Sequence, residues 1–147
     1  MKNKTLVLVA LCIAVNIALG QVVSALKLPV FLDTIGTILA ALLMGPWIGM
    51  ITGLCTNLIW GLISGPVAAA FAPVSMAIGL AAGLLGRCGL FRSLPLAIVS
   101  GVLVTVVVTL VATPIRTYLF GGVTGSGADF LGAYLNAVGQ KLLQSVA

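Results

Sequence analysis

Few side chains in this sequence could do chemistry. The acidic residues are Asp33 and Asp129, and Arg116 precedes Asp129 in the same part of the chain. Asn57 and Trp60 lie three positions apart, so on a helix they share one face. A few polar groups among apolar side chains are the composition expected of a pocket for a small molecule. We therefore predict substrate-binding roles for Asp33, Asn57, Trp60, Arg116 and Asp129.

Each of these residues also has a structural explanation. Asp33 could pair with Lys27, and Asn57, like Asn16, could form a hydrogen bond between helices. Trp60 could anchor its helix at a membrane interface. These alternatives stay open at the level of sequence.

The last segment of the sequence, "ADFLGAYLNAVGQKLLQSVA", adds amide groups. Asn136, Gln140 and Gln144 fall four apart, on one face of an amphipathic helix that begins near Asp129. This polar stripe could face water from a helix at the membrane surface, or it could face a ligand cavity. On the second alternative, Asn136 and Gln140 are further substrate-binding candidates.

The residues needed for catalysis or for metal binding are missing. The sequence has no His and no Glu, and Cys12, Cys55 and Cys88 lie far apart without metal-ligand spacing. It contains neither a phosphate-binding loop nor a nucleophile with an adjacent base. We predict no enzymatic activity, no metal and no cofactor.

The composition indicates a membrane protein. Of 147 residues, 61% are hydrophobic and 6% are charged, whereas soluble domains have about 25% charged residues. The net charge of +5 comes from basic residues at the ends of apolar runs, which does not indicate nucleic-acid binding. The uncharged run after Lys4 exceeds the apolar region of a signal peptide, about 7–15 residues, so we expect a first spanning helix there.

Five apolar runs approach the length of about 20 residues that spans a bilayer. They are roughly Thr5–Leu26, Pro29–Met44, Pro46–Ile63, Val67–Leu85 and Leu94–Thr113. Pro73 lies inside the fourth run and is expected to kink it, and Pro114 is expected to end the fifth. The sequence thus predicts an all-α bundle of five spanning helices plus a C-terminal amphipathic or partial sixth helix.

The orientation of the bundle follows from its basic residues. On one side of the membrane the topology places Lys2, Lys4, Arg87 and Arg92. The other side carries fewer basic residues and both acidic ones, so the N-terminus is expected in the cytoplasm. Gly45-Pro46 then forms a tight cytoplasmic hairpin.

Small residues recur at helical spacing along these runs. Glycines four apart should let helices approach closely in the third run (Gly45, Gly49, Gly53) and in the fourth (Gly79, Gly83). On the first helix Ala10, Ala14 and Ala18 form a smooth stripe that would suit docking against another membrane helix.

The blocks "FLDTIGTILAALLMGPWIG" and "FGGVTGSGADF" resemble the substrate-capture subunit, or S component, of energy-coupling factor (ECF) transporters. This resemblance implies a six-helix protein of the bacterial plasma membrane that takes up a vitamin or related micronutrient from outside. It also implies partners: a membrane coupling subunit, on which the alanine stripe would dock, and two ATPase subunits. The family's pocket lies where Lys27, Asp33, Arg116 and Asp129 fall here.

One feature departs from the family pattern, because we count five spanning runs and the family has six spanning helices. Either the last segment spans despite Lys141, or residues 1–147 form a single transmembrane domain that lacks its last helix; we favour the second. A different class of function, the membrane sensor domain of a bacterial histidine kinase, shares a similar Gly-Pro-x-x-Gly hairpin. A structural membrane protein without a ligand would leave the clustered polar residues unexplained.

Overall fold

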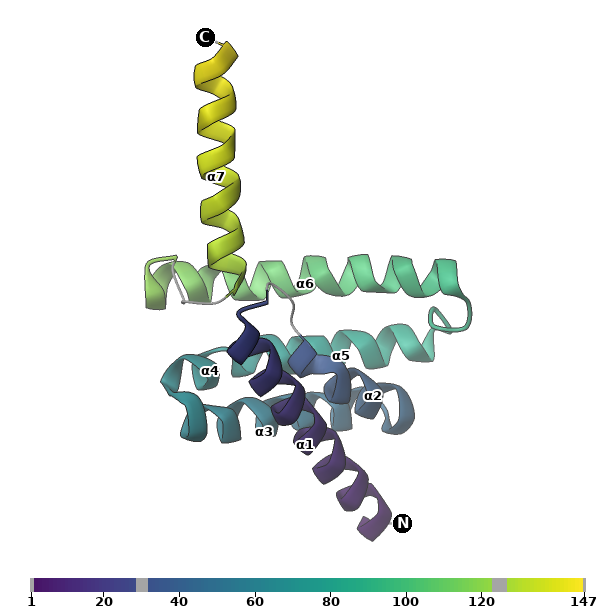
Figure 1. The fold of residues 1–147 in the computed structure, drawn as a ribbon. Coiled ribbons are helices and arrows are strands. Elements are labelled where there is room, and N and C mark those ends of the chain that lie inside the picture. The colour runs from purple at the N-terminus through teal and green to yellow at the C-terminus, as the bar shows by residue number, and fades with distance from the viewer. Residues whose placement is uncertain (1, 29–31, 123–126, 147) are drawn as a thin grey trace.

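The computed structural model describes residues 2–28, 32–122 and 127–146, which form helices and short connections with no β-strand. In chain order the elements are α1 (Lys2–Leu26), the 3-10 helix η1 (Leu32–Thr34), α2 (Ile35–Met44), α3 (Pro46–Ser64), α4 (Pro66–Ala70), α5 (Ala72–Arg87), α6 (Leu94–Phe120) and α7 (Gly127–Val146). Figure 1 shows α3, α5 and α6 alongside one another, with α1 crossing them obliquely. The expected all-α bundle is confirmed.

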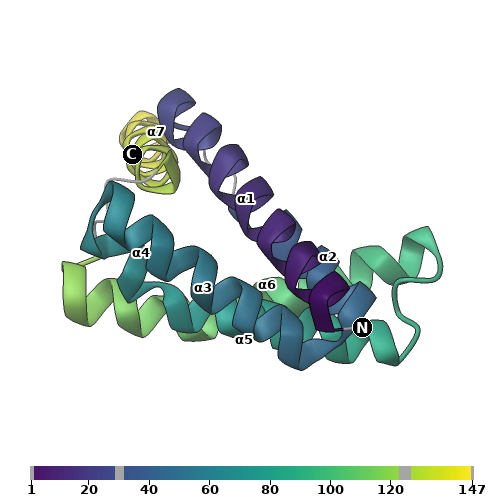
Figure 2. The same ribbon diagram turned by 90° about the horizontal axis from the view of Figure 1, so that it is seen from below.

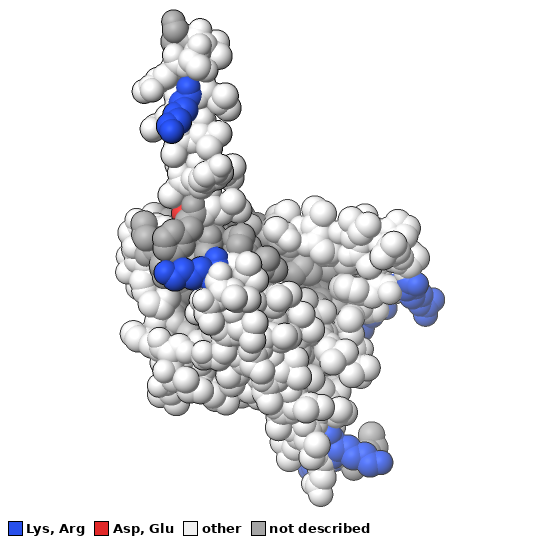
Figure 3. All heavy atoms as spheres, in the orientation of Figure 1, with Lys and Arg blue, Asp and Glu red and all other residues white. Residues whose placement is uncertain are grey.

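The five apolar runs are found as helices, the second as η1 with α2 and the fourth as α4 with α5. By length and composition, α1, α3 and α6 are long and apolar enough to cross a membrane, while Leu32–Met44 and α5 are shorter apolar helices. Large apolar side chains cover much of the surface, as expected for contact with lipid. Figure 3 shows Lys and Arg at only a few separate places on a surface that is otherwise almost uncharged.

The two prolines expected to disturb helices behave differently: the fourth run is interrupted beside Pro73, as expected, but by a break instead of a kink, whereas the prediction for Pro114 was wrong. The fourth run is divided at Phe71 into α4 and α5, and Pro73 occupies the second position of α5, where its missing N–H removes no helical hydrogen bond. The fifth run does not end at Pro114, because α6 continues through it to Phe120. Membrane helices tolerate such a proline when other groups satisfy the freed backbone.

Glycines bring the central helices into backbone contact, as predicted. A Cβ atom on Gly79 of α5 would lie 2.4 Å from the Gly49 carbonyl carbon of α3, and one on Gly53 would lie 2.5 Å from the Ser75 carbonyl oxygen. Between α2 and α3, Gly45 adopts φ 105°, which a residue with a side chain rarely does. The predicted hairpin at Gly45-Pro46 is therefore confirmed, and α3 and α5 form a closely packed centre.

The two ends of the bundle differ in character. Figures 1 and 2 both place the N-terminus, the α2–α3 hairpin and the α5–α6 connection toward the same end. The end of α6 and the junction of α3 with α4 lie at the other end. The sequence places four basic residues at the first of these ends, consistent with the expected orientation.

Helix α7 stands apart from the other helices. It projects crosswise to α6 in Figure 1, and Figure 2 views it nearly end-on. From Leu131 to Val146 its side chains are exposed except at Gly139. The structure thus gives α7 no place within the packed bundle.

Candidate functional site

A cavity of about 710 Å³ lies between the central helices and α6. Its walls come from η1 and from segments of α1 through α6, so residues distant in sequence face one space. One part of the lining is apolar and includes Ile38, Phe71, Val74, Ile78, Val104 and Val108. This size and mixture match those of a small-molecule site, for which about 300–1,000 Å³ is usual.

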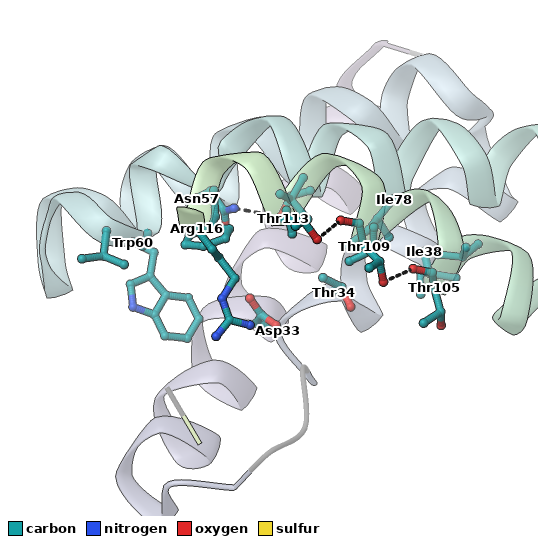
Figure 4. A pocket seen from close by; sticks show the side chains of 18 of the residues that line it. Asp33, Thr34, Ile38, Asn57, Trp60, Ile78, Thr105, Thr109, Thr113 and Arg116 are labelled. Carbon is teal, nitrogen blue, oxygen red and sulfur yellow. Dashed lines mark hydrogen bonds between the residues drawn. The ribbon is translucent and has the colours of Figure 1, made fainter. Parts of the chain in front are cut away.

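Four of the predicted binding residues line this cavity: Asp33, Asn57, Trp60 and Arg116. Asp33 comes from η1, just before α2. Asn57 and Trp60 share a face of α3, as their spacing predicts. Figure 4 shows the Asp33 and Arg116 side chains pointing toward each other from η1 and α6.

Asp129 takes part in a different way. It does not line the cavity, but its Oδ1 atom accepts a hydrogen bond and ion pair from the Arg116 guanidinium. The side chains are 31% exposed for Arg116 and 13% for Asp129, so this pair is partly shielded from solvent. Asp129 thus joins the first turn of α7 to the last turns of α6 and neutralises the arginine next to the cavity.

Two lining residues also hold helices together. The Asn57 amide nitrogen donates to the Ser75 hydroxyl at 2.8 Å, which joins α3 to α5. The Trp60 ring packs over Gly20 of α1, where a Cβ atom would lie 1.7 Å from the indole. The interhelical hydrogen bond expected for Asn57 is therefore confirmed, and both residues have structural contacts besides facing the cavity.

Sequence reasoning missed a row of threonines on α6. Thr105, Thr109 and Thr113 line the cavity one helical turn apart (Figure 4). Each hydroxyl donates to the carbonyl four residues earlier, at distances of 2.8, 2.8 and 2.6 Å respectively. Their spacing of four in an otherwise aliphatic run was the signal that could have identified this face.

The structure does not bring Asn136 and Gln140 to the cavity. Both side chains are exposed on α7, as is that of Gln144, and none of the three lines the cavity. The predicted binding residues on α7 beyond its first turn, Asn136 and Gln140, are thus separate from the cavity.

Helix α1 has an inner and an outer face. Cys12, Asn16 and Gly20 are buried in the bundle, whereas Ala10, Ala14 and Ala18, two positions earlier in each case, are exposed. The alanine stripe is thus available to a partner helix.

Asn16 joins three helices. Its amide oxygen accepts from the Gly36 N–H at 2.6 Å, and its amide nitrogen donates to Thr37 at 2.9 Å and to Thr56 at 3.2 Å. The structural explanation considered for this asparagine is confirmed.

Metal ligands are not assembled in the described part of the chain. Residues 2–28, 32–122 and 127–146 contain no group of three His, Cys, Asp or Glu side chains that could hold an ion. The groups that line the cavity are those described above: carboxylate, guanidinium, amide, hydroxyl and apolar side chains.

Comparison with known proteins identifies the family of this chain. A family model described as ECF transporter, substrate-specific component, matches residues 4–143, nearly the whole chain. No curated protein and no solved structure matches significantly. The chain therefore belongs to the family of substrate-specific components of ECF transporters.

Proposed function

We propose that this protein captures a vitamin or related micronutrient from outside the cell in the cavity between η1, α3, α5 and α6. The single observation that carries this proposal is the cavity itself, about 710 Å³ of mostly apolar lining with a few polar groups converging on it. Asp33, Asn57, Trp60 and Arg116 would contact the substrate, and Asp129 would hold Arg116 in position.

The position of the cavity supports capture from outside. Its charged lining residue on α6, Arg116, lies in the last two turns of that helix, whereas the basic residues Arg87 and Arg92 flank its beginning. Under the positive-inside rule the beginning of α6 is cytoplasmic and its end is external. A ligand would then enter from the outer side.

The exposed alanine stripe supports a membrane partner. Ala10, Ala14 and Ala18 present small side chains on a helix that is long enough to span the bilayer. Small residues at this spacing allow two membrane helices to approach closely. We propose that this face docks on a membrane coupling subunit, and that two ATPase subunits energise transfer to the inside.

A cavity-filling variant tests this function. In Val108→Trp an indole would occupy space that Val108 now borders. Val102→Trp is the matched control, because Val102 is 59% exposed on the same helix and does not line the cavity. Each purified protein is incubated with the small-molecule fraction of yeast extract, washed and denatured, and the released compounds are identified by mass spectrometry.

We expect at least one compound to be retained by the wild type and by Val102→Trp but not by Val108→Trp. Circular dichroism checks that all three proteins are folded. If folded Val108→Trp retains the same compounds in the same amounts as the wild type, the cavity is not the binding site.

A further inference from the structure

The α6 wall of the cavity carries a row of hydrogen-bond acceptors. The hydroxyl hydrogens of Thr105, Thr109 and Thr113 are already donated to carbonyls of α6. Each hydroxyl oxygen can therefore offer only lone pairs to a ligand. Three acceptor sites thus follow one another along the α6 wall (Figure 4).

Asn57 also offers a hydrogen-bond acceptor to the cavity. Its amide nitrogen donates to the Ser75 hydroxyl at 2.8 Å. The amide oxygen, which can accept two hydrogen bonds, remains for a ligand. The α3 wall therefore also presents an acceptor to the cavity, beside the second Asn57 N–H and the Trp60 N–H as donors.

Two carboxylates and one guanidinium lie together at one end of the cavity. Arg116 contributes one positive charge and is paired with Asp129, which contributes one negative charge. Asp33 adds a second negative charge and forms no ion pair with any residue that the structure describes. Asp33 is therefore a lining carboxylate that lies outside the Arg116–Asp129 ion pair.

We propose that the substrate of this cavity is an organic cation, with an apolar body and a protonated nitrogen that donates hydrogen bonds to Asp33 and to the threonine oxygens of α6. This inference rests on the proposed function and names the chemical class of its ligand. An N–H donor carrying positive charge satisfies both the Asp33 carboxylate and the row of acceptors. The apolar wall of Phe71, Val74 and Ile78 receives the body of the molecule.

An anionic substrate fits these groups poorly. Arg116 could attract it, but Asp129 is already paired with that guanidinium and the Asp33 carboxylate points toward it as well. A second anion there would repel both carboxylates, and like charges brought together in a partly buried site destabilise a complex.

The test asks separately whether the protein binds a ligand in this cavity and which charge that ligand carries. The small-molecule fraction of yeast extract is divided by ion exchange at pH 7 into a cationic, a neutral and an anionic pool. The thermal unfolding midpoint of the protein is measured with each pool, for the wild type, Val108→Trp, Asp33→Asn and Thr109→Val. The midpoints without any pool show whether each variant is folded.

We expect the cationic pool alone to raise the midpoint of the wild type, and Val108→Trp to lose this shift. Asp33→Asn should need about tenfold to a hundredfold more of the pool for the same shift, because one charge-assisted hydrogen bond is lost. Thr109→Val preserves the shape of the side chain and should show a smaller loss. Should Asp33→Asn be unfolded, Thr109→Val and the three pools with the wild type still decide the question.

Two results would count against the inference in different ways. A shift produced by the neutral or the anionic pool and lost in Val108→Trp would overturn the cationic substrate but leave the proposed function standing. If no pool shifts the wild type, or if Val108→Trp responds as the wild type does, the proposed function fails and the inference fails with it.

Discussion

Replacing Asn16 by alanine should loosen the junction of α1, α2 and α3. The side chain of Asn16 is fully buried and makes three hydrogen bonds to the other two helices. One of them has no ready replacement. The first N–H groups of a helix lack a partner within that helix, and Gly36 is the second residue of α2. Thr34 at the start of α2 makes no side-chain cap, so the Asn16 oxygen from α1 takes its place.

The expected loss of stability follows from these bonds. Hydrogen bonds between membrane helices contribute about 0.6 kcal/mol on average and at most about 1.7. Three of them therefore amount to roughly 2 kcal/mol. Leaving the buried Gly36 N–H without an acceptor adds about 1–3 kcal/mol, since a stranded donor loses its hydration as well. We expect Asn16→Ala to lower the free energy of unfolding by about 3–5 kcal/mol.

The measurement is reversible unfolding by sodium dodecyl sulfate in mixed micelles, followed by circular dichroism. Asn136→Ala is the matched control, because it is the same substitution at an exposed position of α7 and should change the free energy by less than about 0.5 kcal/mol. Thr37→Val removes one acceptor and should fall between the two, at about 0.6–1.7 kcal/mol. Equal unfolding midpoints for Asn16→Ala and Asn136→Ala would refute the role assigned to this junction.

Three further predictions concern packing, orientation and docking. Gly79→Ala places a methyl group against the α3 backbone and should destabilise the protein by about 1–3 kcal/mol. Gly101→Ala is the control, because open space surrounds Gly101 and the added methyl group should not destabilise the protein. Equal effects of the two substitutions on thermal unfolding would contradict the role assigned to Gly79 in helix packing. In intact cells, a membrane-impermeant thiol reagent should label Leu28→Cys but not the native exposed Cys88. Labelling of both residues from outside would contradict their placement on opposite sides of the membrane. Ala14→Trp should still bind a ligand in the cavity but should no longer co-purify with the coupling subunit. The control Gly101→Trp should preserve both properties. An unchanged complex with Ala14→Trp would refute docking through the alanine stripe.

Much of the fold could be predicted from hydropathy and glycine spacing. Apolar length alone located the helices, because the membrane demands about 20 residues per span and leaves few alternatives. Glycine positions predicted the hairpin at Gly45 and the close approach of helices at Gly49 and Gly79, because glycine has no side chain to keep two backbones apart. The error concerned Pro114, where local preference for a break depends on what the surrounding helices can satisfy.

The cavity was less accessible to sequence reasoning. Polarity within apolar runs identified Asp33, Asn57, Trp60 and Arg116 as lining residues, since such groups need a reason to be there. The sequence could not show that Asp129 pairs with Arg116, because that contact depends on how α7 meets α6. Nor could it separate the first turn of α7 from the amides farther along the same helix.

The passage of α6 through Pro114 has a mechanical consequence. Proline has no N–H, so the Leu110 carbonyl accepts no helical bond and the backbone there is less stiff. This soft point lies just before Arg116, whereas the opposite wall of the cavity is built on helices in backbone contact at Gly49 and Gly79. The wall formed by α3 and α5 is thus expected to deform less easily than the wall formed by α6, and Arg116 lies on the α6 wall.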